Sequence, residues 1–150
     1  MLKQQQSSNN KPHAGVGVII RQNRKVILGR RLNRPMAGSW QLPGGWIHFA
    51  ETPEQAVHRQ LNQFEDLHVG KIQFVAYTNN VFDEHTHSLS LYFMVDCLNN
   101  DPQKLINKNN TVEWLWADWN KLPEPLFLPL QLLKQSGFNL ETSFEREKDA

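Results

Sequence analysis

Three arginines in a short polar segment have the chemistry to bind phosphate groups. Arg30, Arg31 and Arg34 lie in the segment 30–38, whose Asn, Pro and Gly content predicts a loop. A guanidinium group presents a planar fork of donors that matches pairs of phosphate oxygens. A solvated basic loop would have the same composition, so both interpretations stay open at this point.

Three histidines in two predicted loops are the next candidates for chemistry. The run Asp-Glu-His-Thr-His at 83–87 carries side chains that bind metals. Two histidines two residues apart in a polar turn more often mark a solvated hairpin tip, and we favour that interpretation. His48 precedes Glu51 in a second loop. It has the chemistry to face a phosphate or act as a base, while a surface position is the simpler interpretation.

Trp114 and Trp116 alternate with Leu115, so a strand would place both indoles on one face. Stacking of an aromatic side chain on a nucleobase contributes about 1–3 kcal/mol in single-strand-binding proteins. Packing in the core is the alternative, and we favour it for Trp116, Trp40 and Trp119. The two interpretations of Trp114 stay balanced.

The elements that must position these residues are strands with two helices. Segments rich in β-branched and aromatic residues predict strands at 15–20, 25–29, 39–43, 71–82, 88–98 and 111–117. Gly44 and Gly45 are expected to close the third of these. Thr52, Pro53 and Glu54 predict the start of a helix that runs to about Asp66. A final short helix is expected at 126–135. This order predicts a mixed sheet with helices packed on its faces.

Length and composition exclude several classes. The chain has 150 residues, with 16 Lys and Arg against 15 Asp and Glu. That predicts one domain, without the basic surface of a protein that binds a DNA or RNA polymer. No apolar run approaches the roughly 18 residues of a membrane span, so we expect no membrane partner. The single cysteine, Cys97, is expected to be a buried thiol in a cytoplasmic protein.

The ends of the chain are polar. Residues 1–13 are expected to be a disordered lead-in and residues 139–150 a polar tail, leaving 14–138 as the domain.

A resemblance rests on the spacing of Gly45, Glu51 and Arg59, with Leu61 and Leu67 further on. Together with the segment 38–44, these residues resemble the Nudix signature. The similarity extends over residues 14–138 and implies the Nudix fold, an α+β fold (α/β/α sandwich) with a mixed β-sheet flanked by helices. The nearest branch is the MutT-like nucleoside-triphosphate diphosphatases. A second similarity, through Asn33-Arg34-Pro35, is to GDP-mannose hydrolases.

The resemblance also implies a Mg or Mn site, and here the sequence departs from the family. The metal-binding glutamates of the signature correspond to Gln60, Gln63 and Phe64. Glutamine lacks the charge that favours magnesium, and phenylalanine has no donor. Glu65 is adjacent, but one residue turns about 100° around a helix. Glu51 and Arg59 are expected to pair and hold the loop in shape.

The expected function therefore has alternatives. The resemblance implies a pyrophosphohydrolase of nucleotide triphosphates, with Glu51, Arg59, Gln60 and Gln63 as the remnant catalytic box and its activity weak or lost. The ligand is expected to contact Arg30, Gly44, Gly45, His48 and Trp114. A non-catalytic module that binds a nucleotide-like molecule or a partner is the first alternative. A sugar-nucleotide hydrolase is the second. A homodimer stays open.

Overall fold

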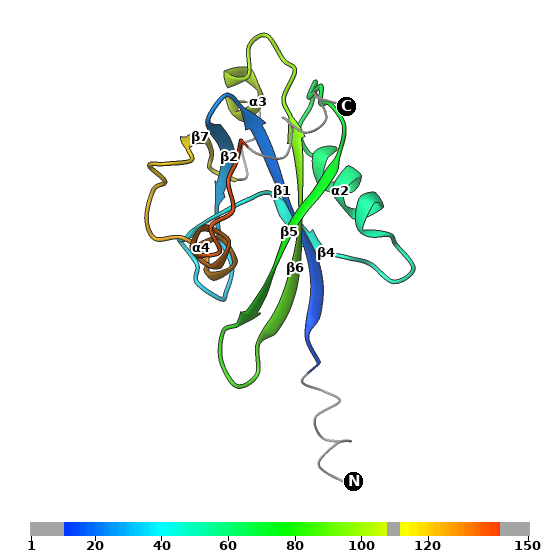
Figure 1. Cartoon of the computed structure of the whole chain (residues 1–150), viewed down its shortest axis with the longest axis vertical. Coiled ribbons are helices and arrows are strands. Elements are labelled where there is room, and N and C mark those ends of the chain that lie inside the picture. Colours follow the sequence, from blue (N-terminus) through cyan, green and yellow to red (C-terminus); the bar gives the residue numbers. More distant parts are fainter. Residues whose placement is uncertain (1–10, 108–111, 142–150) are drawn as a thin grey trace, which may run out of the picture.

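The sheet is the frame of the molecule. The computed structural model describes residues 11–107 and 112–141. Within these residues, seven strands form one sheet with the order β3-β2-β1-β6-β5, while β4 pairs with β1 and β7 pairs with β2. The strands are β1 His13–Gln22, β2 Lys25–Arg30, β3 Trp40–Gln41, β4 Gly44–Trp46, β5 Gln73–Val81, β6 His87–Asp96 and β7 Trp114–Asp118. β1 and β6 are parallel, which makes the sheet mixed (Figure 1).

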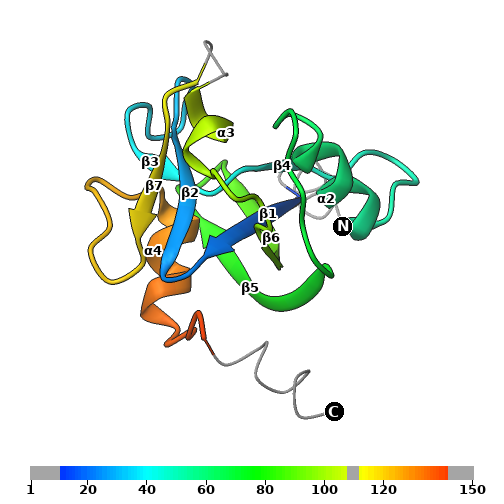
Figure 2. The same ribbon diagram turned by 90° about the horizontal axis from the view of Figure 1, so that it is seen from above.

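Two of the helices cover opposite faces of this sheet. α2 spans Pro53–Leu61, α3 spans Gln103–Asn107 and α4 spans Leu128–Gln135. Ala56, Val57 and Leu61 of α2 belong to one hydrophobic core, and Leu130 and Leu133 of α4 belong to the other. Alternate residues along β1 and β6 supply both cores, as period-two strands require. Viewed from above, the two helices flank the crossing strands (Figure 2). The expected layered α+β fold is confirmed.

Most of the predicted elements are present. β1 and β2 form the predicted hairpin, with Gln22 opposite Lys25. Thr52 is the N-cap of α2, and its hydroxyl accepts a hydrogen bond from the Gln55 amide while the Gln55 side chain accepts from the Thr52 amide. Gly137 follows α4 with a φ of +83°, a conformation that favours glycine.

Two local predictions were wrong. Gly44 and Gly45 do not close a strand but form β4, opposite Gly17 and Val16 of β1. α2 ends at Leu61, before the predicted end near Asp66, and Asp66 has a φ of +62°. The structure also has a short helix, α3, in the polar segment after β6, for which the sequence pattern predicted no element.

Two described residues outside the predicted domain 14–138 take part in the fold. Residues 1–10 and 142–150 of the two polar ends lie outside the described residues. β1 begins at His13, the last residue of the predicted lead-in. Leu140, in the predicted tail, is buried in the core beneath α4, and its carbonyl accepts a hydrogen bond from Arg21.

No helix of the described chain has the length and apolar character needed to cross a bilayer. Cys97 is buried and unpaired, as predicted.

Candidate functional site

A salt bridge fixes the loop between β4 and α2. Arg59 donates from Nε to one Glu51 oxygen and from Nη2 to the other, both at 2.9 Å. The same Nη2 reaches the Trp46 carbonyl at 2.8 Å, and the His48 amide donates to Glu51 at 2.9 Å. One residue at each end of the loop is thereby tied to α2. The pairing therefore shapes the loop.

These partners also set the charge of Glu51. The hydrogen bond from Arg59, followed by that from the His48 backbone, lowers the pKa of Glu51 to about 2. The pKa of Arg59 is raised by the same pair. Both groups are therefore charged at neutral pH and engaged with each other.

The first two metal-binding positions of the box form an amide cluster. In the orientation that satisfies its neighbours, the Gln60 amide donates to the Gly44 carbonyl at 3.1 Å and accepts from Arg59 at 3.2 Å. Gln63 donates to the Gln60 carbonyl at 2.9 Å. A Cβ on Gly45 would come within 2.6 Å of the Gln60 amide. Glycine at position 45 therefore leaves the space that the Gln60 side chain occupies between β4 and α2.

The third position is part of the core. Phe64 is 4% exposed and packs edge-on against Trp114, with ring centroids 4.9 Å apart. Because α2 has already ended at Leu61, Phe64 turns into the core beneath the helix. Glu65 is exposed beyond the helix end. The chain shows no helical face that combines positions 60, 63 and 64.

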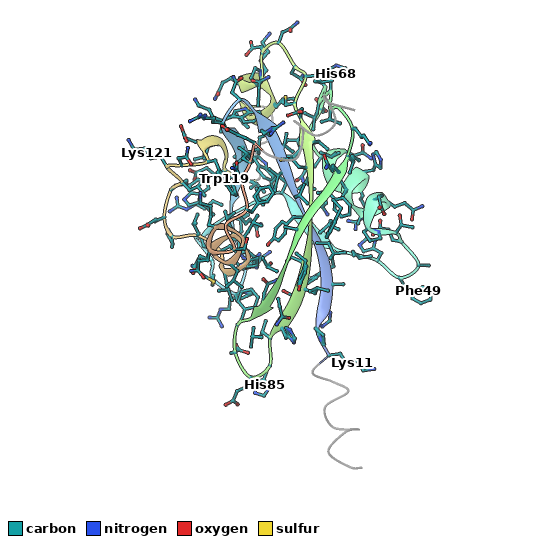
Figure 3. All side chains as sticks on the ribbon, in the orientation of Figure 1. Lys11, Phe49, His68, His85, Trp119 and Lys121 are labelled. Atoms are coloured by element: carbon teal, nitrogen blue, oxygen red, sulfur yellow. The ribbon has the colours of Figure 1, made fainter. Side chains whose placement is uncertain are left out.

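A cavity of about 470 Å³ lies on the α4 face of the sheet. Its lining includes Gly44 and Gly45 of β4, residues 31 and 33–35 of the loop after β2, and the start of α4. The hairpin between β5 and β6 forms another wall, and His85 lies at its tip (Figure 3). This volume is in the range typical of small-molecule sites.

The cavity lining is cationic and aromatic. Its basic side chains are Arg31, Arg34, His13, His85 and His87, and the described lining contains no Asp or Glu. Its aromatic side chains are Trp46, Phe82, Tyr92 and Phe127. Such a lining suits a ligand that combines negative charge with a flat ring.

Arg31 is held firmly at this site. It donates to the Pro35 and Arg34 carbonyls and to Gln41, at 2.9, 3.1 and 2.8 Å. Its guanidinium lies 4.0 Å from the centre of the Phe127 ring. Burial lowers its pKa. Arg31 is therefore oriented before any ligand arrives.

A smaller cavity of about 220 Å³ lies beside the large one. Arg30, Gln63 and Trp114 line it, and Gly44 and Arg31 line both cavities. The Gly44 region thus lies between the remnant box and the large cavity.

The structure divides the predicted ligand contacts into separate groups. Gly44 and Gly45 line the large cavity, whereas Arg30 and Trp114 line the smaller one. His48 is exposed in the β4–α2 loop and lines neither. Its backbone, rather than its ring, contacts Glu51. The groups 83–87 and 31–34 of the sequence come together at the large cavity.

Sequence reasoning missed several residues of the large cavity. Trp46, Phe82, Phe127 and Ser88 carry no local pattern that separates a cavity wall from a core or a surface. The available indication was that these residues lie at strand ends and in loops. It becomes useful only when the order of the strands is known, because that order decides which ends lie near the arginines.

The fold and this loop–helix unit define a Nudix-type protein. The family model described as "NUDIX domain" matches residues 11–135. The chain belongs to this family. An ADP-ribose pyrophosphatase of Methanocaldococcus jannaschii is 29% identical over 125 residues, which cover 82% of this chain and 72% of that protein. An RNA pyrophosphohydrolase of Hydrogenovibrio crunogenus is 25% identical over 154 residues and 91% of each chain.

Solved structures agree with this assignment. The crystal structure of Shewanella oneidensis NrtR superposes with a TM-score of 0.64 at 26% identity, covering 83% of this chain and 61% of that chain. A MutT NUDIX hydrolase from Burkholderia pseudomallei gives a TM-score of 0.65 at 21% identity, over 83% of this chain and 98% of that chain. The second likeness shows the fold alone.

Nudix hydrolases generally use divalent metal ions, and the donors present here do not fit one. Hard cations prefer several carboxylate oxygens. The described residues contain no group of three or more His, Cys, Asp or Glu placed to hold a metal. Glu51 is engaged by Arg59 and His48, the two glutamines carry no charge, and Phe64 is buried.

Proposed function

We propose that this chain binds a nucleoside-diphosphate derivative in the large cavity and that its metal-dependent hydrolysis is weak or lost. The observation that carries this proposal is the neutral cluster at the box. Gln60 is bound to Gly44 and Arg59, and Phe64 is buried against Trp114. The cavity beside it keeps two arginines and three histidines for a direct contact with phosphate.

The relatives support the class of ligand. The two curated relatives are a pyrophosphatase of ADP-ribose and a pyrophosphohydrolase of RNA, so each is named for cleaving a phosphate anhydride. Membership of their family favours a diphosphate-containing ligand for this chain. The nucleotide-triphosphate branch, the absence of a polymer partner, a homodimer and a cytoplasmic location stay predictions.

A sugar nucleotide is the second candidate ligand. Asn33, Arg34 and Pro35, which carry the resemblance to GDP-mannose hydrolases, all line the large cavity. A sugar next to this segment would explain their position. GDP-mannose therefore belongs in the ligand panel with ADP, ADP-ribose and the nucleoside triphosphates.

Calorimetry and a turnover assay test the proposal together. The purified chain is titrated with each ligand in Mg²⁺, in Mn²⁺ and in EDTA, and the cleaved nucleotide, together with pyrophosphate, phosphate or a sugar product, is followed in parallel by chromatography. We expect binding that EDTA does not change and turnover near the background. Turnover that requires Mg²⁺ and disappears in Glu51→Gln would show an active enzyme and overturn the loss of hydrolysis. Absence of binding to every ligand would overturn the ligand class.

A second variant tests why activity is weak. Gln60→Glu with Gln63→Glu places one carboxylate in the last turn of α2 and one just after the helix, both near Gly44, and is expected to bind Mn²⁺ more tightly than the wild type. Changes to residues that only hydrogen-bond to a metal's ligands alter metal affinity by about 10–100-fold, so a gain of tenfold or more is expected from two added ligands. Gln103→Glu, which adds one charge on α3, is the control. Phe64 stays unchanged because a glutamate there would be buried among apolar side chains.

A further inference from the structure

A buried polar cluster lies along the floor of the large cavity. Asn80 of β5 is completely buried, and Ser88 of β6 is 5% exposed. The Asn80 amide nitrogen lies 3.0 Å from the Ser88 hydroxyl oxygen and 2.9 Å from that of Ser90. Both serines line the cavity. One amide group therefore donates its two hydrogens to two hydroxyls at the cavity floor.

This arrangement sets the direction of the serine hydroxyl hydrogens. A hydroxyl oxygen that accepts from Asn80 must send its own hydrogen elsewhere. The Tyr92 hydroxyl lies beside this cluster and shares a hydrogen bond with the Thr78 hydroxyl at 2.9 Å. Within the described chain, Asn80 is the hydrogen-bond partner of the Ser88 hydroxyl, and no second partner is present. The Ser88 hydrogen is thus available to the cavity.

The part of the cavity around Ser88 carries hydroxyls, aromatic rings and the histidines of the β5–β6 hairpin, whereas both arginines of the lining lie in the loop after β2. Phe82 and Phe127 lie on the wall with ring centroids 5.4 Å apart. Thr86 and Tyr92 add further hydroxyls to the lining. Phe127 also contacts the Arg31 guanidinium, which lies 4.0 Å from its ring centre, so this ring joins the Ser88 part to the arginines. An uncharged ring with a hydrogen-bond acceptor fits the hydroxyl-lined part, and the phosphates fit the arginines.

We propose that Ser88 determines ligand specificity by donating a hydrogen bond to an uncharged acceptor of the nucleoside or sugar part. Asn80 is the positioning residue that orients this hydroxyl. The inference rests on the proposed function, since it divides the same cavity into a phosphate end and an uncharged end. A base carbonyl, a ring nitrogen and a sugar oxygen share the required chemistry.

Two probes separate the ends of the cavity. Calorimetry on the full chain compares ADP, GDP, CDP and UDP with inorganic pyrophosphate, which has no uncharged part. Ser88→Ala is expected to weaken the tightest nucleoside diphosphate about 3- to 10-fold, the loss of one hydrogen bond, and to leave pyrophosphate unchanged. Ser136→Ala, which removes a hydroxyl at the end of α4, is the control. A changed ranking of the four bases identifies a base acceptor, and a larger loss for ADP-ribose than for ADP identifies a sugar acceptor.

A double mutant tests the role of Asn80. If Asn80 acts through Ser88, Asn80→Ala weakens nucleotide binding as Ser88→Ala does, and the double variant shows no further loss. Additive losses, or equal losses for nucleotide and pyrophosphate, would overturn the proposal. So would nucleotide binding that Ser88→Ala does not change, and this result stands even when Asn80→Ala fails to fold. A wild type that binds neither probe would instead contradict the proposed function.

Discussion

At the scale of single residues, Glu51 and Arg59 have a structural role that does not depend on a metal. Arg59 donates two hydrogen bonds to Glu51. Glu51 also accepts from the His48 amide, and Arg59 also donates to the Trp46 carbonyl at the end of β4. The pair therefore holds the loop against α2 whatever occupies positions 60, 63 and 64. The sequence predicted this pairing, because the spacing of the two residues matched the family signature.

The lowered pKa of Glu51 predicts a pH-dependent stability. A carboxyl group with a pKa near 2 in the folded protein and about 4.5 in the unfolded chain stabilises the fold above pH 4.5. This stabilisation is lost as the pH falls from 4.5 to 2. Urea unfolding should therefore show wild type more stable than Glu51→Gln at pH 6, with the difference shrinking toward pH 2. Glu84→Gln, at an exposed position, is the control, and a difference that persists at pH 2 would contradict the assignment.

At the scale of elements, β4 depends on glycine. A Cβ on Gly44 would lie 2.2 Å from the Val16 carbonyl oxygen of β1, a contact that only a backbone shift relieves. β4 pairs with β1 in this close approach and supplies part of the cavity lining.

Gly44→Ala is therefore expected to destabilise the protein by about 1–3 kcal/mol, the usual cost of overpacking, and to weaken nucleotide binding. Chemical denaturation and calorimetry measure the two effects. Gly70→Ala is a matched control, because a Cβ at position 70 meets nothing within 4 Å. Equal stability of the two variants would contradict the close packing of β4.

The elements that sequence reasoning missed share a cause, which is that their partners are distant in the chain. Gly44 and Gly45 look like a turn until β1 lies beside them. The residues after Leu61 were predicted to be helical. In the fold, Phe64 packs instead against Trp114, 50 positions further along the chain. Ser88 belongs to a recognisable strand, and its place beneath a cavity follows only from the positions of α4 and the loop after β2. Local periodicity found the strands, and tertiary contacts decided their ends and the site.

At the scale of the whole molecule, the segment after α4 reaches into the hydrophobic core that α4 covers. Leu140 is 2% exposed, and its carbonyl accepts a hydrogen bond from Arg21, which also pairs with Asp96 of β6 at 2.8 Å. This connection fastens the segment after α4 to the middle of the sheet. The predicted polar tail therefore contains a residue of the core, Leu140.

Leu140→Ala is expected to lower the free energy of unfolding by about 2–5 kcal/mol, as for other buried leucines. Leu98→Ala, at a leucine 61% exposed, should have little effect. Thermal or urea unfolding of the two variants tests this difference. Similar stability losses would show that the end of the described chain is not part of the cooperative unit.

The survival of the Glu51–Arg59 pair beside a neutral box has a consequence for how such chains are recognised. Gly45, Glu51 and Arg59 are the residues of the signature that shape the β4–α2 loop, and this chain has all three. The glutamates of the same signature have a different role, which is to bind the metal. The residues that shape the loop are thus present here without the metal-binding glutamates of the same signature, and the family match establishes the fold.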